Sequence, residues 1–197
     1  MEEAKNMALG FYFDMTRCVG CRACQVACKD RNNLDIGLLF RYAKTYETGT
    51  FPKVGMYNYS GSCNHCENPA CVTVCPTGAM YKAEDGTVIH DDEMCIGCKS
   101  CMNICPYGAP KFDEARSIVR KCDACASQRA KGENPVCVDA CPSRALDFGE
   151  RDELIAKYGP DLVKDLPILP DSKLTNPNTL IKAKPCALEE DFRELPT

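Results

Sequence analysis

The chain has 197 residues and a formal net charge of −4, and no basic stripe is visible, which argues against nucleic-acid binding. Its 17 cysteines, 13 glycines, 13 prolines and lack of tryptophan leave little large apolar surface for this length. The hydrophobic fraction of 45% counts cysteine as apolar, so we expect a thin organic core and bound metal in its place. The sequence contains no run of 18 or more apolar residues, so no membrane span is predicted, and residues 1–13 lack the pattern of an export signal.

A short strand is predicted at residues 10–14, and a cysteine quartet follows it directly. Sixteen cysteines form four such quartets: Cys18, Cys21, Cys24 and Cys28; Cys63, Cys66, Cys71 and Cys75; Cys95, Cys98, Cys101 and Cys105; and Cys122, Cys125, Cys137 and Cys141. Three cysteines two residues apart and a fourth after three more are typical of bacterial-type [4Fe–4S] ligation, in which the fourth thiolate reaches a second cluster. We therefore expect the 16 cysteines to be the iron ligands of four [4Fe–4S] clusters.

Disulfide scaffolds and structural zinc proteins are two other classes of cysteine-rich protein. Secreted disulfide scaffolds are rich in cysteine, but they have no reason to repeat a three-ligand loop with a displaced fourth ligand. Structural zinc takes four ligands as two pairs, which would leave the regularly placed third cysteines unexplained. Both interpretations are disfavoured by the spacing.

The connection between the first two quartets, residues 29–62, contains no metal ligand. Within it, residues 38–42 are predicted to form a strand and residues 49–52 a loop. A connection of this length is either functional, for example in contacting a partner, or a plain surface excursion, and the sequence leaves both interpretations open.

Similar segments follow each of the last three quartets. After the second, Asp85-Gly86 lies between two short strand-like runs and predicts a hairpin turn. Residues 106–112 repeat the pattern after the third quartet, with residues 117–120 as the returning strand, and residues 142–148 repeat it again after the fourth. These repeats resemble ferredoxin half-units, each with a ligand loop, a helical turn and a hairpin strand.

The last predicted element is a short helix at residues 151–158, with Gly159-Pro160 as its stop. Residues 162–197 are rich in proline and show no clear helix or strand period. We expect them to form an extended arm on their own domain or on a partner, with disorder of the last residues as the alternative.

Five histidine, lysine and arginine residues lie close to quartet cysteines in the sequence. His65 lies between two ligands, but four thiolates are already available to each cluster, so a surface or loop-stabilising role is expected for it and for His90. Lys99, Arg120 and Lys121 lie next to ligands and could raise a cluster's potential, although ordinary solvated charges explain them equally well.

One cysteine, Cys186, lies outside the quartets, in the C-terminal tail. It is predicted to be a free surface thiol, with a role in partner contact as the weaker interpretation.

Motifs around the later cysteines are more specific than the spacing alone. They are Cys-Asn-His-Cys-Glu-Asn-Pro-Ala-Cys at 63–71, Cys-Pro-Tyr-Gly-Ala-Pro at 105–110 and Cys-Pro-Ser-Arg-Ala-Leu-Asp-Phe-Gly at 141–149. With the order of the quartets, they make residues 10–160 resemble the iron–sulfur electron-transfer (beta) subunit of the dimethyl sulfoxide reductase family of molybdopterin oxidoreductases. Similar subunits belong to polysulfide, tetrathionate, nitrate and formate-oxidising complexes, so the resemblance names no substrate.

The resemblance implies an α+β fold of two nested bacterial ferredoxin-like units with four cubane clusters and little regular secondary structure. The outer unit would comprise residues 1–49 and 111–160, the inserted unit residues 50–110, and the extended arm residues 161–197. The implied ligand sets are Cys18, Cys21, Cys24 and Cys141; Cys28, Cys122, Cys125 and Cys137; Cys63, Cys66, Cys71 and Cys105; and Cys75, Cys95, Cys98 and Cys101.

Three features bear on the place of the chain within this class. In the similar subunit of respiratory nitrate reductase a tryptophan takes the place of Cys101 and a three-iron cluster results, so Cys101 favours four cubanes. Lys29 follows Cys28 in place of a proline, as in the dimethyl sulfoxide reductase type. The C-terminal membrane helix of the formate dehydrogenase type is missing.

Subunits of this kind work beside a large catalytic chain that holds a bis-molybdopterin guanine dinucleotide cofactor with molybdenum or tungsten, commonly with a membrane anchor that exchanges electrons with quinol. The resemblance therefore implies a non-catalytic electron-transfer subunit. It also implies a place at the outer face of the cytoplasmic membrane or in the periplasm, reached by carriage with an exported partner, with cytoplasmic residence as the alternative.

The second hypothesis is a free-standing polyferredoxin. The extra segments at 29–62 and after 160 suit permanent contacts better than a diffusing carrier. An enzyme that acts alone is a poor third, because no nucleophile, open coordination position or acid–base pair is visible.

Overall fold

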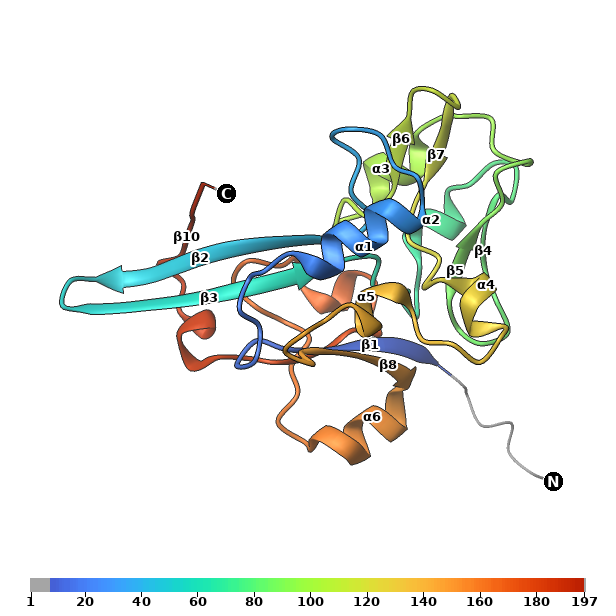
Figure 1. Ribbon diagram of the computed structural model, residues 1–197. Helices are drawn as coiled ribbons and strands as arrows, with labels where there is room; N and C mark the ends of the chain where they lie inside the picture. The colour runs from blue at the N-terminus through green and yellow to red at the C-terminus, as the bar shows by residue number, and fades with distance from the viewer. Residues whose placement is uncertain (1–7, 197) are drawn as a thin grey trace.

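The computed structural model describes residues 8–196 as short strands and helices joined by long loops (Figure 1). The strands are β1 (Leu9–Asp14), β2 (Tyr42–Thr50), β3 (Lys53–Gly61), β4 (Met80–Lys82), β5 (Val88–His90), β6 (Lys111–Asp113), β7 (Ile118–Arg120), β8 (Leu146–Glu150), β9 (Leu180–Lys182) and β10 (Arg193–Glu194). The helices are α1 (Ala23–Arg31), α2 (Ala70–Thr73), α3 (Ser100–Ile104), α4 (Ala126–Arg129), α5 (Val136–Asp139) and α6 (Arg151–Tyr158), with 3-10 turns η1 (Ser172–Leu174) and η2 (Pro185–Leu188). The mixture of helices and small sheets agrees with the expected α+β class.

The central sheet has three strands in the order β8-β1-β9. β1 pairs antiparallel with β8, with Phe11 opposite Phe148, and parallel with β9, with Phe13 opposite Ile181. The strand predicted at residues 10–14 is therefore confirmed, and its consecutive aromatic side chains are all buried because the strand is covered on both faces. The sheet places the segment after the fourth quartet beside the segment before the first.

The predicted helix at residues 151–158 is confirmed as α6, which follows β8 directly. Tyr158 stacks on Tyr12 of β1 with ring centroids 3.6 Å apart, and its hydroxyl donates a hydrogen bond to Asp147 at 2.6 Å. The helix ends at Gly159, whose φ of 93° few residues other than glycine adopt. These contacts hold α6 against the central sheet.

The connection at residues 29–62 contains a long hairpin of β2 and β3. Its two strands pair from Tyr42 opposite Gly61 to Thr50 opposite Lys53. Figure 1 shows the hairpin projecting away from the rest of the molecule, and β10 lies beside β2 as a third strand. The strand predicted at residues 38–42 is wrong except for its last residue, because residues 40 and 41 form a bend that buries both side chains.

Two short hairpins follow the second and third quartets, as predicted. β4 pairs with β5, with Met80 opposite His90, and β6 pairs with β7, with Lys111 opposite Arg120. The turn predicted at Asp85-Gly86 is confirmed, since the Gly86 amide donates to the Ala83 carbonyl at 2.9 Å. The third repeat differs: β8 has no local hairpin partner and pairs with β1 instead.

The buried side chains form one large core and smaller ones. The large core combines the apolar residues of β1 with buried cysteines, namely Cys24, Cys28, Cys63, Cys122, Cys137 and Cys141. A smaller core contains Met80, Cys101 and Val119, with Phe112 packed against it. The expected unit boundaries at residues 50 and 110 stay predictions. The first lies at the turn of the β2–β3 hairpin, and the second separates α3 from β6, which pack together.

The segment after residue 160 lies on its own chain as a mostly extended arm. The Asn178 amide donates to the Asn64 carbonyl at 3.0 Å, and the Glu67 amide donates to the Asn176 carbonyl at 2.8 Å. Gly10 permits the close approach of this arm to β1, because a Cβ atom there would lie 2.0 Å from the Asn178 carbonyl oxygen. In the part of the chain that is described, no helix is long and apolar enough to cross a membrane.

Candidate metal centres

The loops of the first and third quartets share one local geometry. Gly20 and Gly97 lie between the first two cysteines of each loop with φ of 70° and 67°. Arg22 and Lys99 follow the second cysteine, and both have a φ of 62°. Two left-handed residues in each loop turn the chain back on itself and bring three thiols to one side. α1 and α3 begin at the next residue.

Site I is the set Cys18, Cys21, Cys24 and Cys141, which together line one cavity. Three of the thiols come from the first loop and the start of α1, and the fourth follows α5. The Ala145 amide donates to the Cys141 sulfur at 3.2 Å, and the Ser60 hydroxyl lies 3.4 Å from the Cys24 sulfur. Cys21 is exposed, so one edge of the site faces solvent.

Site IV is the set Cys75, Cys95, Cys98 and Cys101, which lines a second cavity. Hydrogen bonds from the Ser100 hydroxyl and amide lower the pKa of Cys98, which is exposed. At Cys75, burial raises the pKa, but hydrogen bonds from the residues that follow it, Thr77 among them, outweigh burial and lower it. Sites I and IV thus share one arrangement, in which three thiols of a loop and one thiol from another quartet line a common cavity.

Site II is the set Cys28, Cys122, Cys125 and Cys137, all of which are buried. Cys28 lies one helical turn after Cys24 on α1, so one helix serves sites I and II at points about 6 Å apart along its axis. Burial raises the pKa of Cys28 to about 12 and that of Cys122 well above its usual range. Thiolates at such a site need positive charge beside them.

Site III is the set Cys63, Cys66, Cys71 and Cys105. Burial and the negative charges of the other three thiolates raise the pKa of Cys71 to about 12, against the opposing charge of Lys121. Cys105 follows α3, so the helical turn that the sequence predicted carries this thiol away from site IV. The Thr175 hydroxyl of the C-terminal arm donates to the Cys66 sulfur at 3.1 Å.

His65 lies between sites II and III. It is fully buried, so the surface role expected for it is wrong, while the loop-stabilising role is supported: its Nδ1 accepts a hydrogen bond from the Val88 amide at 3.0 Å. Burial lowers its pKa well below the usual range, so the ring is neutral and its proton is on Nε2, 3.9 Å from the Cys122 sulfur. His90 lines the cavity of site IV with its side chain 5% exposed, so it is not a surface residue either.

The three basic residues next to ligands differ from one another. Lys121 is buried and donates to the Cys122 carbonyl at 2.8 Å and to the Val88 carbonyl, so it is not a solvated charge. Arg120 forms an ion pair with Asp113 at 3.1 Å. The Lys99 ammonium lies 3.6 Å from the centre of the Phe112 ring.

Cys186, the seventeenth cysteine, is a free thiol, but it is half-buried and packs against the large core instead of lying openly on the surface. Its sulfur lies 3.8 Å from the Met56 carbonyl of β3, so it helps to join the arm to the hairpin.

Sequence reasoning missed one residue, Arg41, which lies in the bend before β2 and is 2% exposed. Its guanidinium donates to the Ser62 hydroxyl at 2.9 Å and the Ser60 hydroxyl at 3.2 Å, and it lies 4.5 Å from the centre of the Phe11 ring. No carboxylate among residues 8–196 forms an ion pair with it, and Nε has no partner there. The negative groups that act on it are thiolates of sites I and II, with Cys137 first.

The donor sets fit iron–sulfur clusters better than single metal ions. Within residues 8–196, no three His, Cys, Asp or Glu side chains are arranged to hold one metal ion, and the 17 cysteines there form no disulfide. In a zinc site four thiolates surround one ion at about 2.3 Å, whereas each thiolate of a cubane binds a different iron, so the sulfurs stand further apart. Four soft thiolates at each site suit iron–sulfur ligation.

Arg41 provides a second test of this fit. A buried guanidinium without a carboxylate costs several kcal/mol unless negative charge lies beside it. An oxidised [4Fe–4S] cluster with four thiolate ligands carries a net charge of about −2, which sites I and II would place on either side of Arg41. The residues present therefore fit clusters at these two sites.

Comparison with known proteins agrees with this geometry. Two models of a 4Fe–4S dicluster domain match, one over residues 54–151 and the other over residues 17–79. A component chain of the anaerobic dimethyl sulfoxide reductase of Escherichia coli is 47% identical over 181 residues, which cover 88% of this chain and 87% of that one. The chain belongs to the family of dimethyl sulfoxide reductase iron–sulfur subunits.

The family extends to complexes with other names. The iron–sulfur subunit of an arsenate respiratory reductase from Shewanella is 34% identical, with 75% of this chain and 83% of that one covered. One subunit of a sulfite dehydrogenase from Allochromatium vinosum is 39% identical, with 72% and 68% covered. The 16 quartet cysteines lie within the matched dicluster domains, so the family membership and the site geometry concern the same residues.

Proposed function

We propose that this chain holds four [4Fe–4S] clusters at sites I to IV and serves as the electron-transfer subunit of a dimethyl sulfoxide reductase-like complex. One observation carries the proposal: in each of two cavities, three cysteines of one quartet meet a cysteine from another, Cys141 in the first and Cys75 in the second. This exchange is what cluster pairs of the bacterial ferredoxin type require. When bound, each cluster supplies a one-electron redox centre.

The chain's own residues hold the thiols in place and exclude water. α1 positions ligands of sites I and II, and α3 lies between ligands of sites III and IV. Because β6 and β7 pack with site IV, we place the inserted ferredoxin-like unit at residues 62–120 and the outer unit on either side of it. The arm after residue 160 then closes over site III through Thr175.

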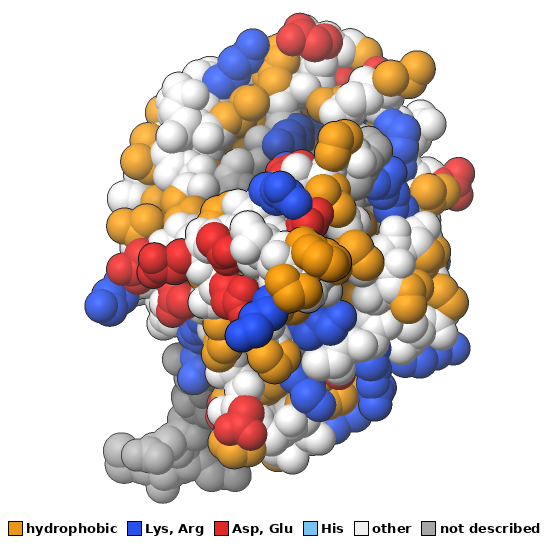
Figure 2. All heavy atoms as spheres, turned by 90° about the vertical axis from the view of Figure 1, so that its left-hand side faces the viewer, with side chains coloured by type: hydrophobic (Ala, Val, Ile, Leu, Met, Phe, Trp, Pro, Cys, Tyr) orange, Lys and Arg blue, Asp and Glu red, His pale blue; other side chains and the backbone are white. Residues whose placement is uncertain are grey.

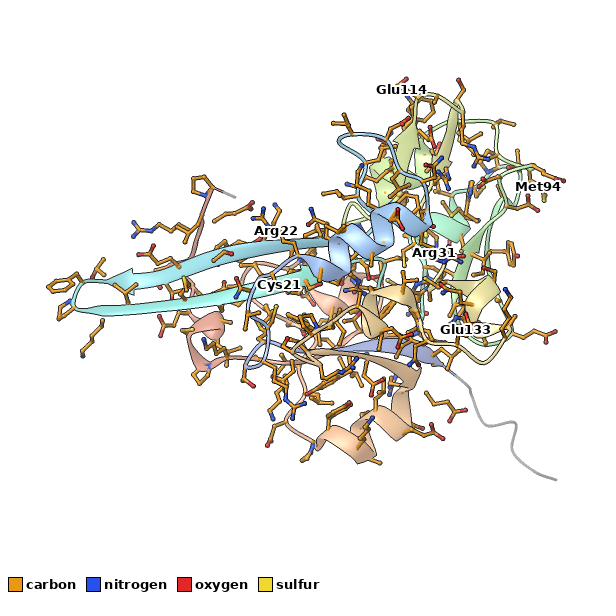
Figure 3. All side chains as sticks on the ribbon, in the orientation of Figure 1. Cys21, Arg22, Arg31, Met94, Glu114 and Glu133 are labelled. Carbon is orange, nitrogen blue, oxygen red and sulfur yellow. The ribbon has the colours of Figure 1, made fainter. Side chains whose placement is uncertain are left out.

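Two sites have an exposed ligand, Cys21 in site I and Cys98 in site IV. Figure 3 shows Cys21 near the start of α1, beside the hairpin, and Met94, next to the site IV loop, on the opposite side of the molecule. We infer that electrons enter and leave at these two sides. A catalytic subunit with a bis-molybdopterin guanine dinucleotide cofactor would lie at one side and a membrane anchor or other redox partner at the other.

The hairpin supports a permanent partner. Its exposed apolar side chains include Phe51, Val54 and Met56, and Figure 2 shows basic and apolar side chains together on the side of the molecule from which the hairpin projects. A diffusing polyferredoxin has no need of such a projection. We place the complex at the outer face of the cytoplasmic membrane, reached by carriage with an exported partner, and assign the chemistry on substrate to the partner.

The test is anaerobic purification of the tagged chain from its native host. We expect a stoichiometric large subunit with molybdenum or tungsten, and oxidation of the reduced chain when the substrate of that subunit is added. A monomer that carries iron and sulfide, alone, would favour the free-standing polyferredoxin. Zinc without sulfide would end the iron–sulfur interpretation.

A further inference from the structure

Arg41 lies next to site I and in the same buried core as ligands of site II. Its guanidinium donates to the Ser60 hydroxyl at 3.2 Å, and the same hydroxyl lies 3.4 Å from the Cys24 sulfur of site I. The guanidinium also lies 4.5 Å from the centre of the Phe11 ring, which belongs to one core with Cys28, Cys122 and Cys137 of site II. One residue is therefore close to the thiols of both sites.

The charge of Arg41 is not needed to hold the local structure. Its hydrogen-bond acceptors are serine hydroxyls and one carbonyl, all neutral, and its ring contact is with Phe11. A neutral side chain of similar length would satisfy these groups without the cost of burying a guanidinium. The charge is thus unexplained by protein groups alone, and the thiolates around it are the only negative groups that act strongly on it in the described chain.

We propose that Arg41 is a positioning residue shared by sites I and II, whose fixed positive charge stabilises the more negative, reduced state of each cluster and raises both reduction potentials together. The inference rests on the ligand sets of the proposed function. Adding one electron to a site adds one negative charge, and in a buried environment a nearby cation opposes that charge strongly. In the described chain no hydrogen bond joins Arg41 to a ligand of site III or IV, and its nearest approach to them is the Ser62 hydroxyl, one residue before Cys63. We therefore expect a smaller effect there than at sites I and II.

The expected effect is a paired shift. In Arg41→Gln, the ratio of oxidised to reduced form at sites I and II rises at least tenfold at a fixed potential, which is a fall of about 59 mV for a one-electron couple. Sites III and IV move less than half as far. Arg41→Lys keeps the charge but loses the planar fork, so it shifts both sites less than Arg41→Gln does.

The control is Arg17→Gln. Arg17 lies one residue before Cys18 and forms an ion pair with Asp14 at 3.6 Å, but its side chain is 58% exposed, and its loss changes the net charge by the same amount. A solvated charge is screened, so this variant leaves the potentials of sites I and II unchanged.

The measurement is an EPR-monitored redox titration of the anaerobically purified complex, with each signal assigned through single-ligand variants. If the wild type lacks four clusters, the proposed function fails and the role of Arg41 fails with it. If the wild type is intact but Arg41→Gln shifts neither site, shifts only one, or shifts all four equally, the inference alone is overturned. A shift in Arg17→Gln as large as that in Arg41→Gln also overturns it.

Arg41→Gln could also fail to assemble, and iron content then decides. Assembly of Arg41→Lys with four clusters, beside loss of iron at sites I and II in Arg41→Gln, supports a requirement for the charge. Loss of iron in both variants would show that the guanidinium shape is what matters, and would overturn the proposal.

Discussion

Sites II and IV each consist of four cysteines, but one site is buried and the other is partly exposed to solvent. All four cysteines of site II are buried, three of them in the large core, near the charge of Arg41, which no carboxylate of the described chain pairs. Site IV belongs to a small core, and Cys98 faces solvent, with hydrogen bonds from Ser100 in place of a buried cation. The thiols of site II are thus surrounded by buried side chains and a fixed positive charge, whereas those of site IV are surrounded by local hydrogen bonds and solvent.

This difference bears on both stability and potential. In the interior, metal and thiols replace the apolar side chains that the chain lacks, so the fold depends on them. At the edge, solvent exposure and hydrogen bonds to sulfur set the potential, and the surrounding hairpins depend less on the cluster.

Removal of iron should have the largest effect. Without metal, six cysteines of the large core lose their ligand bonds, and the apoprotein is expected to lose its cooperative unfolding transition and its near-UV circular dichroism. Thermal scans of the holoprotein and of protein stripped anaerobically with a chelator would measure this. An apoprotein that melts within a few degrees of the holoprotein would contradict a metal-dependent core.

The second prediction compares one ligand from each region. Cys137→Ser removes a buried ligand of site II and should sharply lower the yield of folded protein, whereas Cys98→Ser removes an exposed ligand and should leave a folded chain. Four intact clusters correspond to about 16 iron per chain, and Cys98→Ser should retain about 12 to 15. Iron analysis and yield distinguish the two. Equal losses in both variants would show that burial does not matter.

The third prediction concerns the exchange of ligands between quartets. Cys141→Ser should disturb the cluster of site I and leave the EPR signal of site II intact, since Cys28 completes site II. Cys186→Ser is the matched control, because Cys186 lies in none of the four sites and its loss should leave iron content unchanged. Loss of the site II signal alone in Cys141→Ser would refute the nested arrangement.

The smallest effect is expected at the arm. Thr175→Val removes the hydroxyl that donates to the Cys66 sulfur at 3.1 Å, and a lost donor disfavours the more negative, reduced state. The potential of site III should fall by up to about 59 mV, a tenfold change in ratio. Thr175→Ser keeps the donor and should match the wild type in the same titration. A fall of equal size in the serine variant would assign the effect to packing.

Local patterns in the sequence predicted local structure well. The spacing of the quartets, the turn at Asp85-Gly86 and the helix at residues 151–158 depend on neighbours within a few residues, and the structure has these turns and this helix. The exchange of fourth ligands followed from a helical turn that carries Cys105 away. Which quartets meet depended on resemblance, because their pairing spans most of the chain.

The features that sequence reasoning missed are long-range. Arg41 lies between two aromatic residues, and strand alternation would have exposed it, but a bend turns it into the core. His65 is buried because the arm covers it from residue 178, where the Asn178 side chain donates to the His65 carbonyl at 2.8 Å. Local sequence periodicity predicts neither the burial of Arg41 nor that of His65, because the residues that cover them lie far along the chain.

The pairing of β1 with β8 has a consequence for biosynthesis. A ribosome makes about 5 to 20 residues each second, so roughly 6 to 23 s separate the emergence of Cys24 from that of Cys141. During this interval the first loop waits with reactive thiols and an unpaired strand. Residues 63–105 emerge as a block, so sites III and IV can be complete before sites I and II. The thiols of the first loop must therefore stay reduced until Cys141 has been made, because only then can site I gather its four ligands.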